Sequence, residues 1–556
     1  MPATTPVDAL ADRFWAGLLD LSPVWATMLG DETRADRLDD PSPAGRAREV
    51  ELLRRTRAEA AAIDPAGLGV EERVTLDIIG VVCAIREGWH AHRLWELDAV
   101  DQLAGPQTLP GDLARVQRVD GPERVARLVA RLAAYPAFMD ATIANVEAGH
   151  AAGRMPAPVA FARSIEQVRR MVESPVDAEP LLAAHPELPE ADRAAIREAL
   201  TVHVRPALAR WLATLERLRP AARAGDGLCH LPDGDALYRF AILAFTSLPE
   251  EPQALHDFGR ARIAAIADEM QAIARRLGHP DVSALRAALA TDPTNHATDP
   301  VDLVRLAEGQ IARTTAVAPR WFGRLPVAPV QVRAVEAHQE QEAPPAFYIP
   351  PAADGSRPGI YYLNTFDPAS RPIHRLASTT FHEAVPGHHF QIALEGEQAA
   401  LPDFRRFGSR IAGGAYAEGW GLYSERLADE MGLYADDRER FGMLEAQAWR
   451  AARLVVDTGI HAFGWERERS IALLREAAGL SQLEAETETD RYITWPGQAL
   501  TYMTGQREIE ALRAAIAARD GERFDLRAFH DAVLGHGSLP LATLRAQLPD
   551  WVAPRS

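Results

Sequence analysis

The stretch TTFHEAVPGHHFQ, residues 379–391, places three histidines and a glutamate within eight positions around a Pro-Gly pair. A catalytic zinc ion commonly takes two histidines and a carboxylate from the protein and keeps a fourth position open for water. On a regular helix, residues four positions apart share a face, but the residue four positions after His382 is Pro386. The stretch therefore has the composition of a zinc site without the simple His-Glu-x-x-His spacing.

A break in the helix would resolve this conflict. On one straight helix His388 would lie about 9 Å along the axis from His382, and His389 about 10.5 Å, whereas ligand nitrogens lie ~2 Å from a shared zinc ion. Proline lacks an amide donor and clashes with the preceding turn. We predict a two-residue bulge at Val385-Pro386 that returns His388 to His382 as a metal ligand and leaves His389 on the substrate side or behind the ligands. A restart of the helix could present either ring, and a plain helix end is the alternative without a metal.

The segment GGAYAEGWGLYSERLADEMG, residues 413–432, can supply the carboxylate. Glu418 lies thirty-six residues after His382 on an apolar part of a predicted amphipathic helix, where nearby glycines permit close helix approach. A buried glutamate needs a partner, and a metal would serve. The alternative is a surface glutamate. Glu425 and Glu430, further along, are expected on solvated faces.

A polar stripe follows in RLVVDTGIHAFGW, residues 453–465, where Arg453, Asp457 and His461 recur every four positions on an otherwise apolar helix. Bonds from aspartate to histidine can orient the rings that bind a metal. A buried ion pair without a metal explains the stripe equally well.

The segment DRYITWPGQALTYMTGQREIE, residues 490–510, carries Tyr492, Tyr502 and Arg507 near a second Pro-Gly pair. A tyrosine hydroxyl beside zinc can stabilise an oxyanion. Aromatic residues at helical spacing are more often part of the hydrophobic core, so this segment alone is a weak signal.

Residues 6–320 have the three-and-four apolar spacing of amphipathic helices. The stretches PVAPVQVRAVEAHQ (326–339), PAFYIPP (345–351) and RPGIYYLNTFDP (357–368) instead favour strands, and they predict a small antiparallel sheet before helices resume near Pro372. The strand with Tyr362 could be an exposed edge that binds an extended substrate, although packing within the sheet is the safer interpretation. We expect a mainly α, multi-helical, two-lobed fold: a helical N-terminal lobe (1–325) and a catalytic lobe (326–556).

Composition limits the classes of function. The 556 residues include 60 basic and 78 acidic side chains, for a formal net charge of -18, which disfavours nucleic acid and anionic membrane surfaces as partners. Only two cysteines occur, too few for a disulfide framework. No stretch reaches the ~18 apolar residues of a membrane span, and the N-terminus lacks a signal-peptide pattern. A cytoplasmic location is expected.

Five segments in one order resemble a widespread bacterial family catalogued as a domain of unknown function: FHEAVPGHHFQ, AYAEGWGLYSERLADEMG, RLVVDTGIHAFGW, WPGQALTYMTGQREI and FHDAVLGHGSLPLATL. The resemblance covers most of the chain, best from 330 to 550. Members of this family resemble gluzincin (zincin-like) metallopeptidases, which are mostly helical and have a deep cleft. The resemblance implies that His382, His388 and Glu418 bind zinc and that Glu383 is the general base.

The expected function is a zinc-dependent hydrolase of an amide or peptide bond in a small peptide or amino-acid conjugate. Glu383 would take a proton from water and pass it to the leaving nitrogen, while Tyr502 or His461 would stabilise the oxyanion. One alternative is a metal-dependent hydrolase or lyase of a non-peptide metabolite. Another is a non-catalytic metal-binding relative, against which Glu383 argues, because a structural zinc is more often closed by a fourth protein ligand.

Overall fold

The structure, a computed structural model, describes residues 5–335, 344–352, 355 and 357–552. The end of the predicted strand region 326–339, from residue 336 on, and the first four residues of the N-terminus lie outside this description. The prediction of a mainly α fold is confirmed. Within the described residues no helix is both long and apolar enough to cross a membrane.

The first half of the chain is helical, as its periodicity predicts. Proline occupies the first or second position of many of these helices. At these positions a backbone N–H would have no acceptor within the helix, so the N–H that proline lacks costs no hydrogen bond. The helices are α1 (Pro6–Leu21), α2 (Pro23–Met28), α3 (Pro43–Ala61), α4 (Val70–Ala91), α5 (Leu109–Val116), α6 (Pro122–Ala151), α7 (Pro158–Glu173), α8 (Pro180–Ala183), α9 (Glu190–Ala199), α10 (Arg205–Leu218), α11 (Gly234–Thr246), α12 (Pro252–Arg276), α13 (Val282–Thr291) and α14 (Pro300–Val317).

A small sheet follows α14, with strands β1 (Val330–Ala334), β2 (Ala346–Ile349) and β3 (Gly359–Leu363) in the order β1-β3-β2. The β2–β3 pair is antiparallel, as predicted, but the β1–β3 pair is parallel, so the prediction of a wholly antiparallel sheet is wrong. After β2 the chain turns back and inserts β3 between the two other strands, and β3 then runs in the same direction as β1.

This order also corrects the expectation for the strand that carries Tyr362. β3 lies in the middle of the sheet and pairs on both sides, so it is not an exposed edge strand for substrate. The Tyr362 ring stacks on Phe347 of β2, with 4.9 Å between ring centroids. Packing within the sheet therefore accounts for this tyrosine.

Helices resume after the sheet and continue to the C-terminus. Two short 3₁₀ turns come first, η10 (Pro368–Ser370) and η11 (Ile373–Arg375), and η11 lies next to the predicted position at Pro372. The α-helices are α15 (Leu376–Glu383), α16 (His388–Gly396), α17 (Gly414–Glu430), α18 (Asp437–His461), α19 (Arg467–Ala478), α20 (Gln482–Thr494), α21 (Thr501–Asp520), α22 (Leu526–Leu534) and α23 (Leu541–Trp551).

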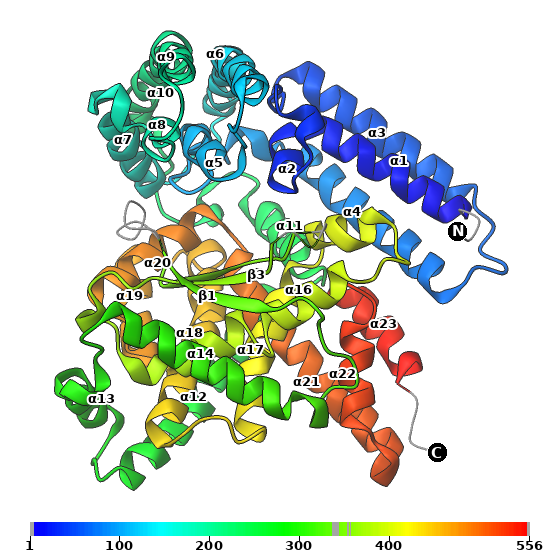
Figure 1. Cartoon of the computed structure of the whole chain (residues 1–556), viewed down its shortest axis with the longest axis vertical. Coiled ribbons are helices and arrows are strands. Elements are labelled where there is room, and N and C mark those ends of the chain that lie inside the picture. Colours follow the sequence, from blue (N-terminus) through cyan, green and yellow to red (C-terminus); the bar gives the residue numbers. More distant parts are fainter. Residues whose placement is uncertain (1–4, 336–343, 353–354, 356, 553–556) are drawn as a thin grey trace.

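The hydrophobic clusters show how these helices combine. One cluster lies between residues 100 and 218, in the group of helices α5 to α10 that gathers at one end of the molecule (Figure 1). Another joins α1, α3 and α4 to α16, α17 and α21 to α23, and a third joins α11 to α13 with α15, α17 and α18. These last two clusters cross residue 325, so the division into lobes 1–325 and 326–556 stays a prediction from sequence.

Candidate metal centre

The helix that carries His382 ends at Glu383, and a new helix begins at His388. The chain therefore breaks and restarts at the Pro-Gly pair, rather than forming the predicted bulge in a continuous helix. Gly387 is required there, since a Cβ atom at this position would lie 1.9 Å from the carbonyl oxygen of His382. The Val385–Pro386 peptide bond is cis.

Helix α17 holds this break in place. The carbonyl oxygen of Pro386 accepts hydrogen bonds from the Trp420 indole N–H at 2.8 Å and from the Ser424 hydroxyl at 3.3 Å. Both donors lie on the helix that carries Glu418. The same contact therefore sets the position of the second histidine and of the carboxylate.

His382, His388 and Glu418 converge at the break, and each offers a ligand atom within 4.8 Å of the others. The Glu418 Oε2 atom lies 3.5 Å from Nε2 of His382 and 3.4 Å from Nε2 of His388. Ligands placed tetrahedrally at about 2.0–2.1 Å from a zinc ion lie about 3.3 Å apart. The two separations from Glu418 are close to this value, and all three ligand atoms lie within 4.8 Å of one another, so the cluster has the size of a site for one metal ion.

Charge in the cluster also suits a cation. Burial alone would raise the pKa of the Glu418 carboxyl, but hydrogen bonds from His382 and His388 hold this pKa well below its usual range. Burial would likewise lower the pKa of His382, but Glu418 and Glu425 raise it to about 9. Both shifts show that the carboxylates favour positive charge between them.

Glu425 lies directly behind His382, which sequence reasoning missed. Its side chain is buried, its Oε1 atom contacts Nδ1 of His382 at 2.9 Å, and the Ser378 hydroxyl donates to its Oε2 atom at 2.9 Å. Such a bond orients the ring and directs Nε2 toward His388 and Glu418.

The expectation that Glu425 is solvated is wrong. It follows Glu418 by seven residues, which is two helical turns on one face, and this spacing was the available signal. Glu430 is exposed, as expected, and pairs with Arg513.

Glu383 directly follows His382 on the last turn of α15 and is half-buried. Among the residues that the structure describes, its carboxylate forms neither a hydrogen bond nor an ion pair. A carboxylate next to a ligand and without a protein partner is available to exchange a proton with a bound molecule.

The Tyr502 ring is a direct neighbour of the His382 ring. The two rings are stacked, with 6.3 Å between their centroids, and the guanidinium carbon of Arg453 lies 4.3 Å from the centre of the Tyr502 ring. Burial, with a contribution from Glu418, raises the pKa of Tyr502, so its hydroxyl stays protonated. The structure thus places Tyr502 beside His382, and its catalytic role stays a prediction.

The other proposed oxyanion group, His461, is not available. Its Nδ1 atom accepts a hydrogen bond from the Leu228 N–H at 3.2 Å, and its Nε2 atom donates to the Tyr492 carbonyl at 2.9 Å. Burial lowers the pKa of His461 to about 3, which keeps the ring neutral. Asp457 accepts from the Tyr238 hydroxyl at 2.6 Å and from the Gly497 N–H, not from a histidine. This part of the stripe joins α11, α18 and α20 and does not orient a ligand.

His389 is likewise taken up by the fold. Its Nδ1 contacts the Tyr348 hydroxyl of β2 at 2.9 Å, and its Nε2 contacts the Ala328 carbonyl at 3.1 Å. The ring therefore links α16 to the sheet and leaves the ligand position to His388. Arg507 pairs with Glu250 at 2.8 Å and does not join the cluster.

Tyr492 and Arg453 form a buried network beside Tyr502. The Tyr492 hydroxyl accepts from Arg453 Nε at 2.7 Å and donates to Glu488 at 2.6 Å. Neither side chain contacts a ligand atom of the cluster through a hydrogen bond within the described part of the chain.

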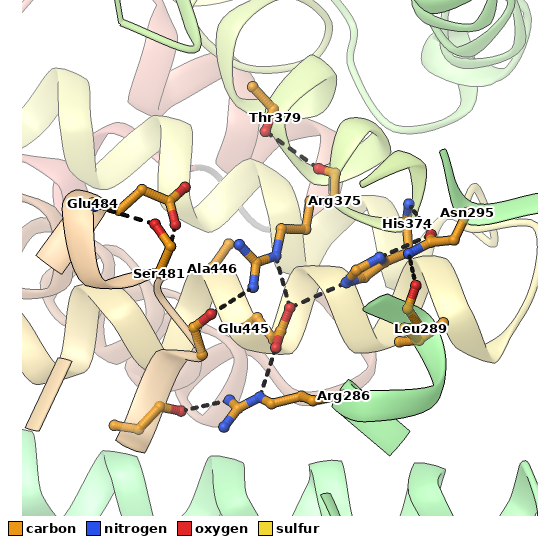
Figure 2. Close-up of polar contacts among 12 residues, drawn as sticks. Arg286, Leu289, Asn295, His374, Arg375, Thr379, Glu445, Ala446, Ser481 and Glu484 are labelled. Atoms are coloured by element: carbon orange, nitrogen blue, oxygen red, sulfur yellow. Dashed lines mark hydrogen bonds and ion pairs between the residues drawn. The ribbon is translucent and has the colours of Figure 1, made fainter. Parts of the chain in front are cut away.

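A second buried carboxylate fixes the start of α15, as Figure 2 shows. Glu445 of α18 pairs with Arg375 at 2.8 Å and His374 at 3.1 Å on η11, and with Arg286 of α13 at 2.8 Å. His374 also contacts the Asn295 side chain at 2.9 Å. These bonds hold the residues directly before the helix that carries His382, and none of them was predicted.

Solved structures with the same fold exist. A Colwellia psychrerythraea protein described as a "putative lipoprotein" is 28% identical, with a TM-score of 0.91 over 98% of each chain. A Shewanella oneidensis protein described as a "putative lipoprotein of unknown function" is 22% identical, with a TM-score of 0.76 over 98% of this chain and 99% of its own. Among curated proteins no relative was found. The sequence model of the bacterial proteins of unknown function DUF885 matches residues 23–548, and the chain belongs to that family.

Proposed function

We propose that the chain is a zinc-dependent hydrolase of an amide or peptide bond in a small peptide or amino-acid conjugate. The observation that carries this proposal is the convergence of two imidazole Nε2 atoms and the Glu418 carboxylate beside Glu383, whose carboxylate has no partner among the described residues. Two histidines and one carboxylate suit zinc and leave room for a substrate atom.

In this proposal, His382, His388 and Glu418 hold the metal. When bound, a zinc ion polarises a carbonyl group and lowers the pKa of water to about 7. Glu383 takes the proton from the attacking water and delivers it to the leaving nitrogen. The Tyr502 hydroxyl, which burial keeps protonated, donates a hydrogen bond to the oxyanion. Glu425 keeps the His382 ring in the required orientation.

The rival functions use the same residues. A hydrolase or lyase of a non-peptide metabolite would need the same ligands and differ in the walls of the site. A non-catalytic metal-binding relative is less consistent with Glu383, because nothing in the described fold gives this half-buried carboxylate a structural role.

The test is zinc content together with turnover. Purified protein supplemented with zinc is expected to hold about one equivalent, and Glu418→Gln is expected to hold much less, because a ligand charge is lost.

Turnover is the second measurement. Protein incubated with a dipeptide mixture is expected to release free amino acids, detected by mass spectrometry. Glu383→Gln should retain zinc and lose about 10²- to 10⁴-fold in rate, while the exposed control Glu430→Gln should match wild type. A Glu383→Gln protein at the wild-type rate would refute the assigned base.

Location is a separate matter. We expected a cytoplasmic protein from the sequence, but two solved structures with this fold are described as a "putative lipoprotein", so these comparisons do not support that expectation. We propose that the chain works in association with a membrane or outside the cytoplasm. Fractionation of the native cells with an antibody to this chain would decide between the compartments.

A further inference from the structure

Three arginines lie near Tyr502. Arg450 and Arg453 belong to α18 and place their guanidinium carbons 5.8 Å and 4.3 Å from the centre of the Tyr502 ring. Arg491 of α20 lies 4.9 Å from the ring of Tyr492, whose hydroxyl contacts Arg453. We call Arg450, Arg453 and Arg491 the arginine wall.

Among the described residues, one carboxylate forms ion pairs with this wall, and it reaches two of the three arginines. Glu488 pairs with Arg453 at 3.1 Å and with Arg491 at 2.7 Å. Among the described residues Arg450 has no carboxylate within ion-pair distance, and its nearest acceptor is the Ala446 carbonyl at 3.4 Å. The arginine wall therefore carries two more positive charges than its one carboxylate can neutralise.

Unsatisfied donors accompany this excess charge. Arg453 is only 3% exposed, yet within the part of the chain that the structure describes its Nη1 atom has no hydrogen-bond partner, and neither does the buried Nε atom of Arg450. A buried N–H donor of a charged group is costly when it has no acceptor. In a chain with a net charge of -18, acidic side chains are plentiful, so the lack of one at this place points to an anion supplied from outside.

The wall is also within reach of the reaction centre. The centre of the Tyr502 ring lies 6.3 Å from the centre of the His382 ring. With the 5.8 Å to Arg450, this limits the distance from His382 to Arg450 to about 12 Å, which two to four extended residues span. A group bound at the wall can thus belong to the same short molecule as an amide at the metal cluster.

We infer that the arginine wall binds a carboxylate of the substrate, and that Arg450 is the residue that recognises it. This inference rests on the proposed hydrolase and restricts its substrates to short peptides or conjugates with a free carboxylate near the scissile amide. Arg450 is half-buried and has no acidic partner among the described residues, so its planar guanidinium can donate two parallel hydrogen bonds to a carboxylate. Arg453 is committed to Glu488 and Tyr492 and supports the positive potential.

Binding to the zinc-loaded Glu383→Gln protein tests this inference without turnover. Titration calorimetry would compare Gly-Phe, Gly-Phe-amide and Gly-Glu-amide, which carry a terminal carboxylate, no carboxylate and a side-chain carboxylate. Gly-Phe should bind on the order of 10- to 100-fold more tightly than its amide, as expected for hydrogen bonds between charged groups. Comparable binding of Gly-Glu-amide would identify a side-chain carboxylate as the ligand.

Variants in the same background locate the contact. Arg450→Gln should abolish the preference for the carboxylate, Arg450→Lys should restore part of it, and Arg438→Gln, an exposed position on the same helix, should leave it unchanged. Replacement of Arg450 leaves no acidic side chain of the described residues without its partner, so the midpoint of thermal unfolding should stay near that of the parent protein.

Three outcomes would overturn the inference: equal binding of Gly-Phe and its amide, no binding of either, or a preference that survives Arg450→Gln. A preference that depends on Arg450 in a protein that hydrolyses nothing would sustain the inference and refute the hydrolase.

Discussion

Glu425 fixes the orientation of His382, a ligand in the proposed metal site, by contacting the Nδ1 atom of its ring. Its carboxylate receives Nδ1 of His382 and the hydroxyl of Ser378, so the ring cannot rotate freely. The negative charge also increases the basicity of the opposite nitrogen, Nε2, which faces Glu418.

Glu425→Gln should therefore weaken zinc binding by about 10- to 100-fold, which is typical for the loss of a partner behind a ligand. Competition with a chromophoric chelator would measure the zinc affinity. Glu430→Gln is the matched control, because Glu430 lies on the same helix but is exposed. Equal zinc affinities of the two variants would contradict this role for Glu425.

The neighbouring histidines should behave differently on truncation. His388→Ala removes an atom of the metal cluster, so zinc content should fall sharply, whereas His389→Ala should retain zinc. His389 is 3% exposed and bonded to Tyr348 and Ala328, so its loss should lower the free energy of unfolding by about 1–3 kcal/mol. Elemental analysis and denaturant titration measure the two effects. The reverse pattern, an empty His389→Ala and a filled His388→Ala, would show that the ligand has been misassigned.

At the scale of elements, the site depends on how closely α17 and α21 approach. Gly419 of α17 faces Gly505 of α21, and a Cβ atom on Gly505 would lie 1.9 Å from the Ala415 carbonyl oxygen. Gly421 meanwhile faces the His382 ring, 2.8 Å from where its Cβ would be. These small residues let the backbones approach, and they set the distance between Glu418 on α17 and Tyr502 on α21.

Gly505→Ala should separate the two helices and lower the free energy of unfolding by about 1–3 kcal/mol, as overpacking of a core does. Thermal unfolding would measure the loss. Gly309→Ala on α14 is the control, because a Cβ there meets nothing within 4 Å. That substitution should be neutral or stabilise by about 0.5–1 kcal/mol, since alanine favours helix. A stable Gly505→Ala protein would mean that the helices do not need this contact.

At the scale of the whole molecule, Glu445 connects segments that are distant in the sequence. Its partners lie on α13 and η11, and Arg375 and Arg286 also bond carbonyl groups at the end of α19. Burial alone would raise the pKa of the Glu445 carboxyl, but Arg375, His374 and Arg286 lower it from 4.5 to about 2.

A folded-state pKa below the unfolded value means that the contribution to stability is present above about pH 4.5 and is lost as the pH falls toward 2. The shift corresponds to about 3 kcal/mol. The difference in free energy of unfolding between wild type and Glu445→Gln should therefore be largest near pH 6 and shrink by pH 3. Denaturant titration across this range would measure it. A difference that stays constant with pH would contradict the ionised state of Glu445.

The helical segments and the residue types of the candidate site could both be predicted from local patterns in the sequence. Apolar periodicity marks the helices, since burial of one face is a local pattern. The Pro-Gly pair at 386–387 marks a break, because proline and glycine act on their own backbone. The residue types around it, together with Glu418, indicated a metal site, and the structure brings His382, His388 and Glu418 together.

Only the tertiary structure decided which polar residues meet. Sequence spacing assigned His461 and Asp457 to the site and Glu425 to solvent, but packing gives the first two backbone and tyrosine partners and buries the third behind His382. The direction of β1 relative to β3 was decided in the same way. The partners of a buried polar group are set by contacts between segments far apart in the chain. Such contacts produce no periodic pattern in the local sequence, so spacing along the chain cannot predict them.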